Sequence, residues 1–223
     1  GISTYGGRLY GMETPDWVFS ARYGGDPHAV INADGWLIPR YWDETYLARY
    51  RDFIRALASR YDSDPRLAWI AIGVGTYGET QPCDDRDDLY VSAALDADWG
   101  TTSDTERSQR WIETVNRITD MYADAFQHTP LVLQFVPVFL RQDCERRETT
   151  THAVGRHGVG LMHTGLQPDG TKLVGTNPAC NNGCGGWDPL ITYGAYVPLV
   201  WESYDLYLRS ARDVYWAVLS ALD

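Results

Sequence analysis

The chain has 223 residues, of which 19 are lysine or arginine and 30 are aspartate or glutamate, so its formal net charge is −11. This acidic balance argues against binding to nucleic acid or to an anionic membrane surface, because both partners reward clustered positive charge. With 44% hydrophobic and 22% charged residues, the composition is that of a globular protein and excludes collagen, a coiled coil and a disordered chain. We expect one domain over residues 1–223.

The sequence has no segment that reads as a membrane span. A spanning helix needs roughly 20 apolar residues, and the most apolar stretch, from Leu131 to Leu140, is interrupted by Gln134 and Pro137. We therefore predict no membrane insertion. The chain begins without methionine and without a charged leader followed by an apolar one, from which we expect a processed, trimmed or partial product.

The first clear structural pattern begins at residue 44. Residues 44–61 place Leu47, Tyr50 and Ile54 on one face, with arginine and aspartate opposite, which predicts an amphipathic helix. An Asp-Ser-Asp-Pro turn ends this helix. Residues 67–74 then form an apolar run of strand length.

The helix and strand patterns then repeat. Helices are expected at residues 107–126, 149–157 and 206–222, and strands at 131–139, 159–163 and 196–201. Strands that are apolar on both faces belong to parallel sheets covered by helices, which indicates an α/β fold, either doubly wound or a barrel. The chain contains no Gly-x-Gly-x-x-Gly or Walker lysine motif, and this favours the barrel over an open nucleotide-binding sheet.

Polar side chains lie toward the ends of the predicted strands. In a (β/α)8 barrel the active site is built just past the C-terminal ends of the strands. The strand ends of this chain give Glu79 after the first strand, Gln134 and Phe139 on the second, His163 on the third and Glu202 on the fourth. Two carboxylates that face each other across a barrel mouth are the apparatus of retaining glycoside hydrolysis, in which one protonates the leaving oxygen and the other attacks the anomeric carbon.

Aromatic residues make up 13% of the chain, with 9 tryptophans and 15 tyrosines. Sugar rings stack on such side chains, so this content favours an oligosaccharide or polysaccharide partner over core packing alone. For His163 and Trp201 the alternative is a place in the barrel wall. The candidate substrate contacts are Tyr77, Gln134, His163, Trp187, Trp201 and Tyr204.

Two segments carry a resemblance to a known family. Residues 38–79, which run from Ile-Pro-Arg-Tyr-Trp-Asp-Glu to Gly-Val-Gly-Thr-Tyr-Gly-Glu, and the segment Val200-Trp-Glu-Ser-Tyr204 resemble the strand 4 and strand 7 regions of clan A glycoside hydrolases, such as family 42 β-galactosidases. The resemblance implies that Glu79 is the acid/base and Glu202 the nucleophile of a retaining glycoside hydrolase acting on a β-linked saccharide. That chemistry requires no cofactor and no metal.

With this assignment of strands, the sequence does not account for all eight strands of a barrel. If Glu79 ends strand 4 and Glu202 ends strand 7, strands 3 to 7 are recognisable and strands 1, 2 and 8 are largely unaccounted for. We therefore expect a TIM-barrel-like fold that is incomplete or a fragment. Two other functions stay open: a structural subunit whose barrel is completed by other chains, and a non-catalytic carbohydrate-binding barrel. Gly78 favours the second, because the clan usually has asparagine before the acid/base glutamate.

All four cysteines, Cys83, Cys144, Cys180 and Cys184, fall in predicted loops. An even number in loops indicates disulfides and an extracellular or secreted protein, with reduced thiols or a metal site as alternatives. Cys180 and Cys184 are the expected pair, because a short loop rich in glycine and asparagine can bend to disulfide geometry.

The acidic run from Asp84 to Asp88 offers oxygen ligands for Ca²⁺, but it lacks the regular spacing of a calcium loop. We expect it to be a solvated loop.

Overall fold

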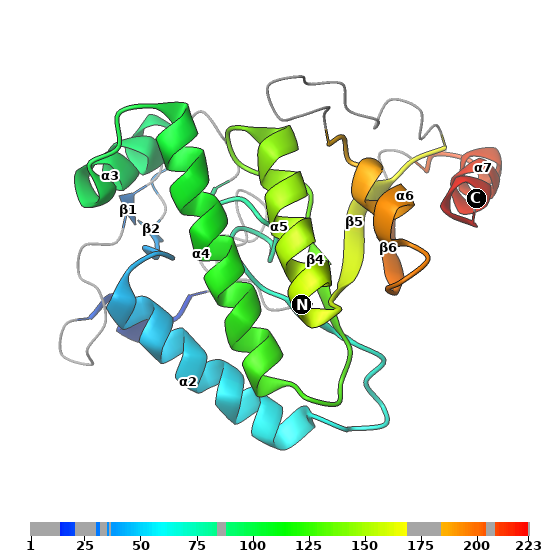
Figure 1. Ribbon diagram of the computed structural model, residues 1–223, viewed down its shortest axis with the longest axis horizontal. Helices are drawn as coiled ribbons and strands as arrows, with labels where there is room; N and C mark the ends of the chain where they lie inside the picture. The colour runs from blue at the N-terminus through cyan, green and yellow to red at the C-terminus, as the bar shows by residue number, and fades with distance from the viewer. Residues whose placement is uncertain are drawn as a thin grey trace.

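The computed structural model describes residues 14–20, 30–31, 35, 37–83, 88–168, 184–203 and 208–222 (Figure 1). Its elements, in chain order, are η1 (Asp16–Phe19), β1 (Val30–Ile31), β2 (Leu37–Ile38), α2 (Glu44–Tyr61), β3 (Ile70–Ile72), α3 (Leu89–Trp99), α4 (Asp104–Ala125), β4 (Leu131–Gln134), α5 (Gln142–His157), β5 (Gly160–Leu166), α6 (Asp188–Tyr193), β6 (Leu199–Ser203) and α7 (Ala211–Leu222).

Four strands form a parallel sheet in the order β3-β4-β5-β6. Helices connect each strand to the next, so the predicted α/β class with a parallel sheet is confirmed. Strands β1 and β2 form a separate antiparallel pair. None of the helices in the described part of the chain is both long and apolar enough to cross a membrane.

The sheet register separates two faces. Ile72, Leu133, Leu161 and Leu199 are neighbours across the four strands. They belong to the main hydrophobic core or pack against it. Since side chains alternate along a strand, Gln134, Met162 and Val200, which are also neighbours, lie on the opposite face.

The helices cover the first of these faces. In Figure 1, α4 and α5 lie side by side across the sheet. Helix α4 contributes Trp111, Val115, Ile118 and Tyr122 to the core, and all four are almost completely buried. Their spacing of three and four residues is the apolar stripe that predicted this helix.

Helix α2 has the predicted bounds, and an aspartate caps its N-terminus. The Asp43 carboxylate accepts a hydrogen bond of 2.9 Å from the backbone N–H of Tyr46, which begins the helix. Tyr50, in the middle of α2, reaches the end of β3, where its hydroxyl donates to the carbonyl of Gly73 at 2.7 Å. The hydroxyl of Tyr122 lies 2.9 Å from that of Tyr50, so α2 and α4 together hold this strand end.

Some elements differ from the expectation. Helix α5 begins at Gln142 rather than near residue 149, and β4 ends at Gln134 rather than at residue 139. Helices α3 and α6 were not expected. In α3 the exposed Leu89 and Tyr90 adjoin the buried Val91, so the sequence shows no single apolar stripe. Helix α6 has only six residues, too few to show a period.

Candidate functional site

Glu79 lies in a tight loop directly after β3. The backbone N–H of Gly75 donates to the carbonyl of Glu79 at 2.9 Å, and that of Thr76 donates to the carbonyl of Gln81 at 3.0 Å. A Cβ atom at Gly75 would overlap the backbone of Gln81, so this close approach requires glycine. The loop therefore has a defined backbone path that presents the Glu79 side chain at the C-terminal end of the sheet.

The Glu79 carboxylate accepts two side-chain amides. Nε2 of Gln81 donates to Oε2 at 2.8 Å, and Nε2 of Gln134 donates to Oε1 at 3.2 Å. Glu79 is half-buried and Gln134, the last residue of β4, is buried. The structure thus brings together two of the predicted site residues from neighbouring strands. Gln81 was not predicted, although its position two residues after Glu79 in the same loop was the available signal.

Hydrogen bonds of Thr80 also hold this loop against the rest of the protein. The hydroxyl of Thr80 donates to the carbonyl of Pro137 at 3.0 Å, and Thr80 pairs with Val138 in an isolated parallel bridge. The indole N–H of Trp111 on α4 donates to the Thr80 carbonyl at 3.0 Å. The residues on either side of Glu79 are therefore tied to the segment after β4 and to the helix layer.

Glu202 lies in β6, two strands away from Gln134. It follows Trp201 and precedes Ser203, and its side chain is exposed. Alternation along β6 puts Glu202 on the same face as Val200, which is the face that carries Gln134. The two predicted catalytic glutamates thus belong to the same side and the same end of the parallel sheet.

His163, Trp187 and Trp201 form a different group. The His163 ring centroid lies 5.3 Å from that of Trp201 and 6.4 Å from that of Trp187, and the two tryptophan centroids are 4.9 Å apart. His163 and Trp201 are register partners one residue beyond Met162 and Val200, so they point to the helix-covered face. This is the placement of core side chains, and it separates them from Glu79.

Burial controls the ionisation of His163. The side chain is 4% exposed, and burial lowers its pKa to about 4 despite an opposing hydrogen bond with the backbone of Thr164. The imidazole is therefore neutral at pH 7.

The remaining predicted contacts are two tyrosines. Tyr77 is half-buried in the loop before Glu79 and has a φ of 55°, in the left-handed region that few non-glycine residues adopt. Tyr204 lies outside the described residues.

The predicted pairing of Cys184 with Cys180 is wrong. Cys184 is a buried thiol, as is Cys83. Cys144 is disulfide-bonded, whereas Cys180 lies outside the described residues. The expectation rested on the length and the glycine and asparagine content of the loop, but Cys184 lies next to the short helix α6, where Asp188 accepts a hydrogen bond of 2.6 Å from the N–H of Gly185.

Of the acidic run, only Asp88 is described. Its carboxylate accepts from the N–H groups of Tyr90 and Val91 at 2.9 and 3.2 Å, and it is 4% exposed. Asp88 is therefore the N-terminal cap of α3.

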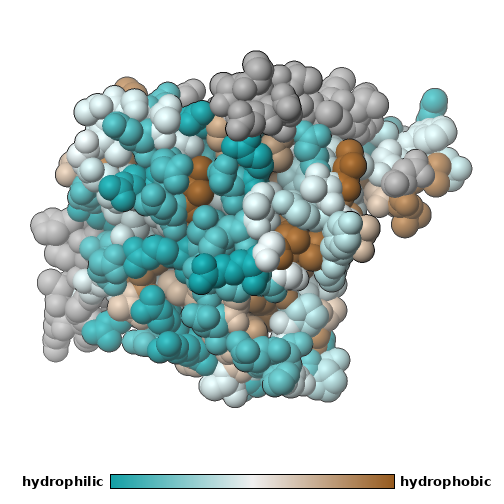
Figure 2. Space-filling model, in the orientation of Figure 1, coloured by the Kyte–Doolittle hydropathy of each residue, from teal (hydrophilic) through white to brown (hydrophobic). Residues whose placement is uncertain are grey.

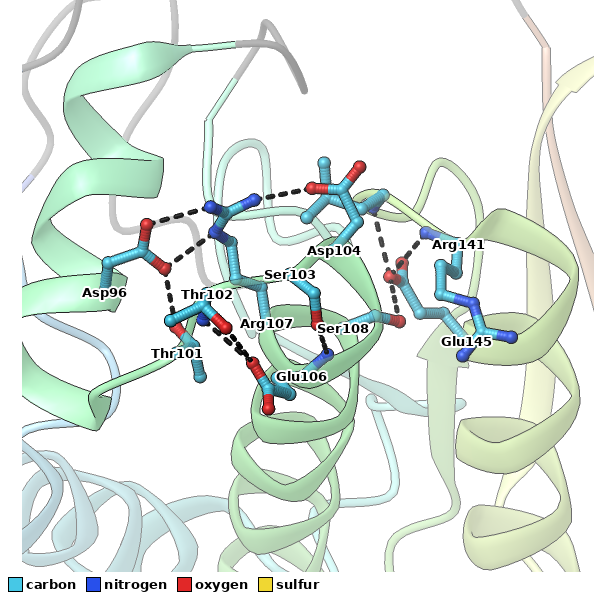
Figure 3. Close-up of polar contacts among 11 residues, drawn as sticks. Asp96, Thr101, Thr102, Ser103, Asp104, Glu106, Arg107, Ser108, Arg141 and Glu145 are labelled. Atoms are coloured by element: carbon cyan, nitrogen blue, oxygen red, sulfur yellow. Dashed lines mark hydrogen bonds and ion pairs between the residues drawn. The ribbon is translucent and has the colours of Figure 1, made fainter.

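A buried carboxylate that the sequence did not single out lies near the start of α4 (Figure 3). Glu145 accepts hydrogen bonds from the Ser108 hydroxyl at 2.6 Å and from three backbone N–H groups, those of Phe139, Leu140 and Arg141. Burial raises the pKa of Glu145, and these four donors oppose the rise. The partners of Glu145 are one serine hydroxyl and three backbone N–H groups, so this carboxylate holds the backbone of the segment between β4 and α5 in place.

A second polar cluster joins α4 to α5. Asp120, His152 and His157 hold one potential metal-ligand atom each within 4.8 Å of one another. The cluster includes the last residue of α5, which precedes β5, whereas Glu79 follows the C-terminal end of β3.

Comparison with known proteins adds no relationship: the chain matches no protein-family model and no curated protein.

Proposed function

We propose that the protein is a retaining glycoside hydrolase that acts on a β-linked saccharide, with Glu79 as the acid/base and Glu202 as the nucleophile. The observation that carries the proposal is the Glu79 carboxylate, held by the amides of Gln81 and Gln134 at the C-terminal end of a parallel sheet. Parallel sheets of α/β proteins place their active sites at this end.

Strand order supports a barrel as the setting of this site. A doubly wound sheet reverses its strand order at a switch point, whereas a barrel adds strands sequentially. The order β3-β4-β5-β6 has no reversal, and every pair is parallel. If these are strands 4 to 7 of a (β/α)8 barrel, Glu79 follows strand 4 and Glu202 lies near the C-terminal end of strand 7, in keeping with the resemblance to clan A glycoside hydrolases.

The chemistry assigns different duties to the two carboxyl groups. Glu202 attacks the anomeric carbon while Glu79 protonates the departing glycosidic oxygen, and water then hydrolyses the glycosyl-enzyme with Glu79 as base. Gln81 and Gln134 fix the direction of Glu79 for both steps. The mechanism requires no cofactor, and the direct attack requires carboxyl groups about 5–5.5 Å apart. We propose a secreted protein with an oligosaccharide or polysaccharide substrate.

The test compares single glutamate variants on an aryl β-glycoside and on a natural oligosaccharide. Glu202→Gln should lower kcat by several orders of magnitude on both substrates, because the nucleophile is lost. Glu79→Ala should lose turnover of the natural substrate yet form the glycosyl-enzyme from the aryl substrate, whose phenolate leaves without a proton. Added azide should then restore turnover and yield a β-glycosyl azide.

Glu113, an exposed residue of α4 that pairs with Arg110 at 3.1 Å, offers a matched control. Glu113→Gln should keep the activity of the unmodified protein. If the unmodified protein cleaves no β-glycoside across a broad panel but binds oligosaccharide, the hydrolase proposal fails and a carbohydrate-binding barrel replaces it.

One observation favours a second candidate, a structural subunit whose barrel is completed by another chain. Helix α7 lies at the edge of the molecule, and Figure 2 shows brown, hydrophobic atoms in that region. The helix exposes five large hydrophobic or aromatic side chains, each at least 44% exposed: Val214, Tyr215, Trp216, Val218 and Leu222. An apolar helix face of this kind is usually covered by a partner. Light scattering after size exclusion should then give a mass above that of one chain.

A further inference from the structure

Two histidines and an aspartate converge where α4 lies against α5. Nε2 of His152 is 2.7 Å from Oδ1 of Asp120, and Nε2 of His157 is 2.6 Å from the same oxygen. The two imidazole ring centroids are 5.7 Å apart. Two imidazole nitrogens from α5 therefore meet one carboxylate oxygen from α4, and the three atoms lie within 4.8 Å of one another.

The surroundings suit a partly enclosed ion. The side chains of Asp120, His152 and His157 are 33%, 20% and 17% exposed. His157 also lines a hollow of about 300 Å³ between the end of α4 and the starts of β4 and β5, whereas the residues that line this hollow do not include Asp120 or His152. An ion held by the three side chains would be partly shielded from solvent.

The proton inventory shows what an ion would replace. Both imidazoles contact the same acceptor oxygen, Oδ1 of Asp120. In the absence of an ion, each ring must therefore carry a proton on Nε2 to donate a hydrogen bond to it. A bound ion would replace these two hydrogen bonds with bonds to the carboxylate oxygen and to the two Nε2 atoms.

We propose that Asp120, His152 and His157 bind one Zn²⁺ ion. Imidazole nitrogen and carboxylate oxygen are both common zinc ligands, with bonds of about 2.0–2.2 Å. Ligand atoms in a tetrahedral site are then roughly 3.3 Å apart, so the contacts of 2.7 and 2.6 Å must widen by about 0.6–0.7 Å. The two Nε2 atoms, which lie within 4.8 Å of each other, must come to a similar separation. Each imidazole would move its proton to Nδ1 and present the Nε2 lone pair, and water would take the fourth position.

One cation stands close to the cluster. Nε of Arg156 lies 3.8 Å from Oδ1 of Asp120, and its charge opposes the ion. The Arg156 side chain is 65% exposed, so it can turn into solvent without losing a buried contact. The bound ion would fasten α4 to the end of α5. This role is independent of the proposed glycoside hydrolysis at Glu79.

The experiment titrates chelator-treated full-length protein with Zn²⁺ in competition with a chromophoric chelator. We expect one ion per chain. His152→Gln, His157→Gln and Asp120→Asn should each weaken binding by more than the roughly 10–100-fold that loss of an outer-shell partner costs. Co²⁺ in place of Zn²⁺ should give the intense visible bands of a four-coordinate site, and these bands should disappear in each variant.

His128 supplies the matched control, since it lines the same hollow but is exposed and outside the cluster. His128→Gln should bind Zn²⁺ as the unmodified protein does. Circular dichroism of each ion-free variant checks that it is folded. The proposal is overturned if the unmodified protein binds no stoichiometric Zn²⁺. It is also overturned if the folded variants His152→Gln and His157→Gln both bind Zn²⁺ with unchanged affinity, which would assign the ion to other residues, such as the thiols.

Discussion

The side-chain amide of Gln134 donates a hydrogen bond of 3.2 Å to Oε1 of Glu79 and so connects the end of β4 to the loop after β3. The two residues come from adjacent parallel strands, where residues 55 positions apart meet because the crossover helices return the chain to the same edge. The other carboxylate oxygen, Oε2, accepts a hydrogen bond from the side-chain amide of Gln81. One donor from strand β4 and one donor from the loop itself therefore orient the Glu79 carboxylate.

The first prediction concerns this orientation. Gln134→Leu keeps the side-chain volume but removes the donor, so Glu79 should lose its fixed direction and kcat on a natural β-glycoside should fall by about 10²-fold. Gln127→Leu is the control, because the Gln127 amide donates to the Ala123 carbonyl at the far end of α4. Unchanged kcat in Gln134→Leu would show that the hydrogen bond does not position Glu79.

The second prediction concerns acid stability. The pKa of His163 is lowered to about 4 from 6.5, so the unfolded chain takes up a proton at a higher pH than the folded protein. The neutral His163 side chain therefore makes a contribution to the free energy of unfolding that is fully present above pH 6.5. This contribution is lost as the pH falls toward 4, by on the order of 3 kcal/mol in total. In His163→Phe this loss should be absent. Urea unfolding of both proteins at pH 7 and pH 4.5 measures it, and equal pH dependence in the two would contradict the assignment.

The third prediction concerns a carboxylate with a lowered pKa. Burial by itself would raise the pKa of Asp62, but the backbone N–H groups of Thr129, Gln127 and His128 lower it to about 2. Its contribution to stability is present above the unfolded pKa near 3.8 and is lost as the pH falls through about 2. Asp62→Asn should destabilise the protein by about 1 kcal/mol at pH 7. The difference from the unmodified protein should shrink in acid, and a constant difference would exclude the charge as its cause.

The fourth prediction counts thiols. The chain has four cysteines, of which Cys83 and Cys184 are thiols and Cys144 is bonded. Titration of denatured, unreduced protein should therefore find two thiols per chain, and reduction should raise the count to four. In the folded protein Cys184 should react slowly, because burial, followed by the charge of Asp188, raises the pKa of its thiol to about 11. Four thiols before reduction would rule out the bond at Cys144.

Local patterns in the sequence determined the repeated helix and strand order. The bounds of α2 were predicted correctly because an apolar stripe begins at residue 44 and a turn with the sequence Asp-Ser-Asp-Pro follows it. The parallel sheet followed from strands that are apolar on both faces. The position of Glu79 just past a strand followed as well, whereas Gln134 was expected inside a strand that ran to residue 139 and is instead the last residue of β4. All of these depend on contacts within a few residues or on a period of the chain.

Tertiary structure decided what depends on side-chain direction and on partners distant in sequence. A shift of one residue along a strand moves a side chain to the other face, so His163 and Trp201 lie with Trp187 against the helices while Gln134 meets Glu79. The predicted partner of Cys184 was wrong for the same reason, because loop length does not specify where a sulfur points. The meeting of Asp120 with His152 and His157 required the packing of α4 on α5, which no local pattern encodes.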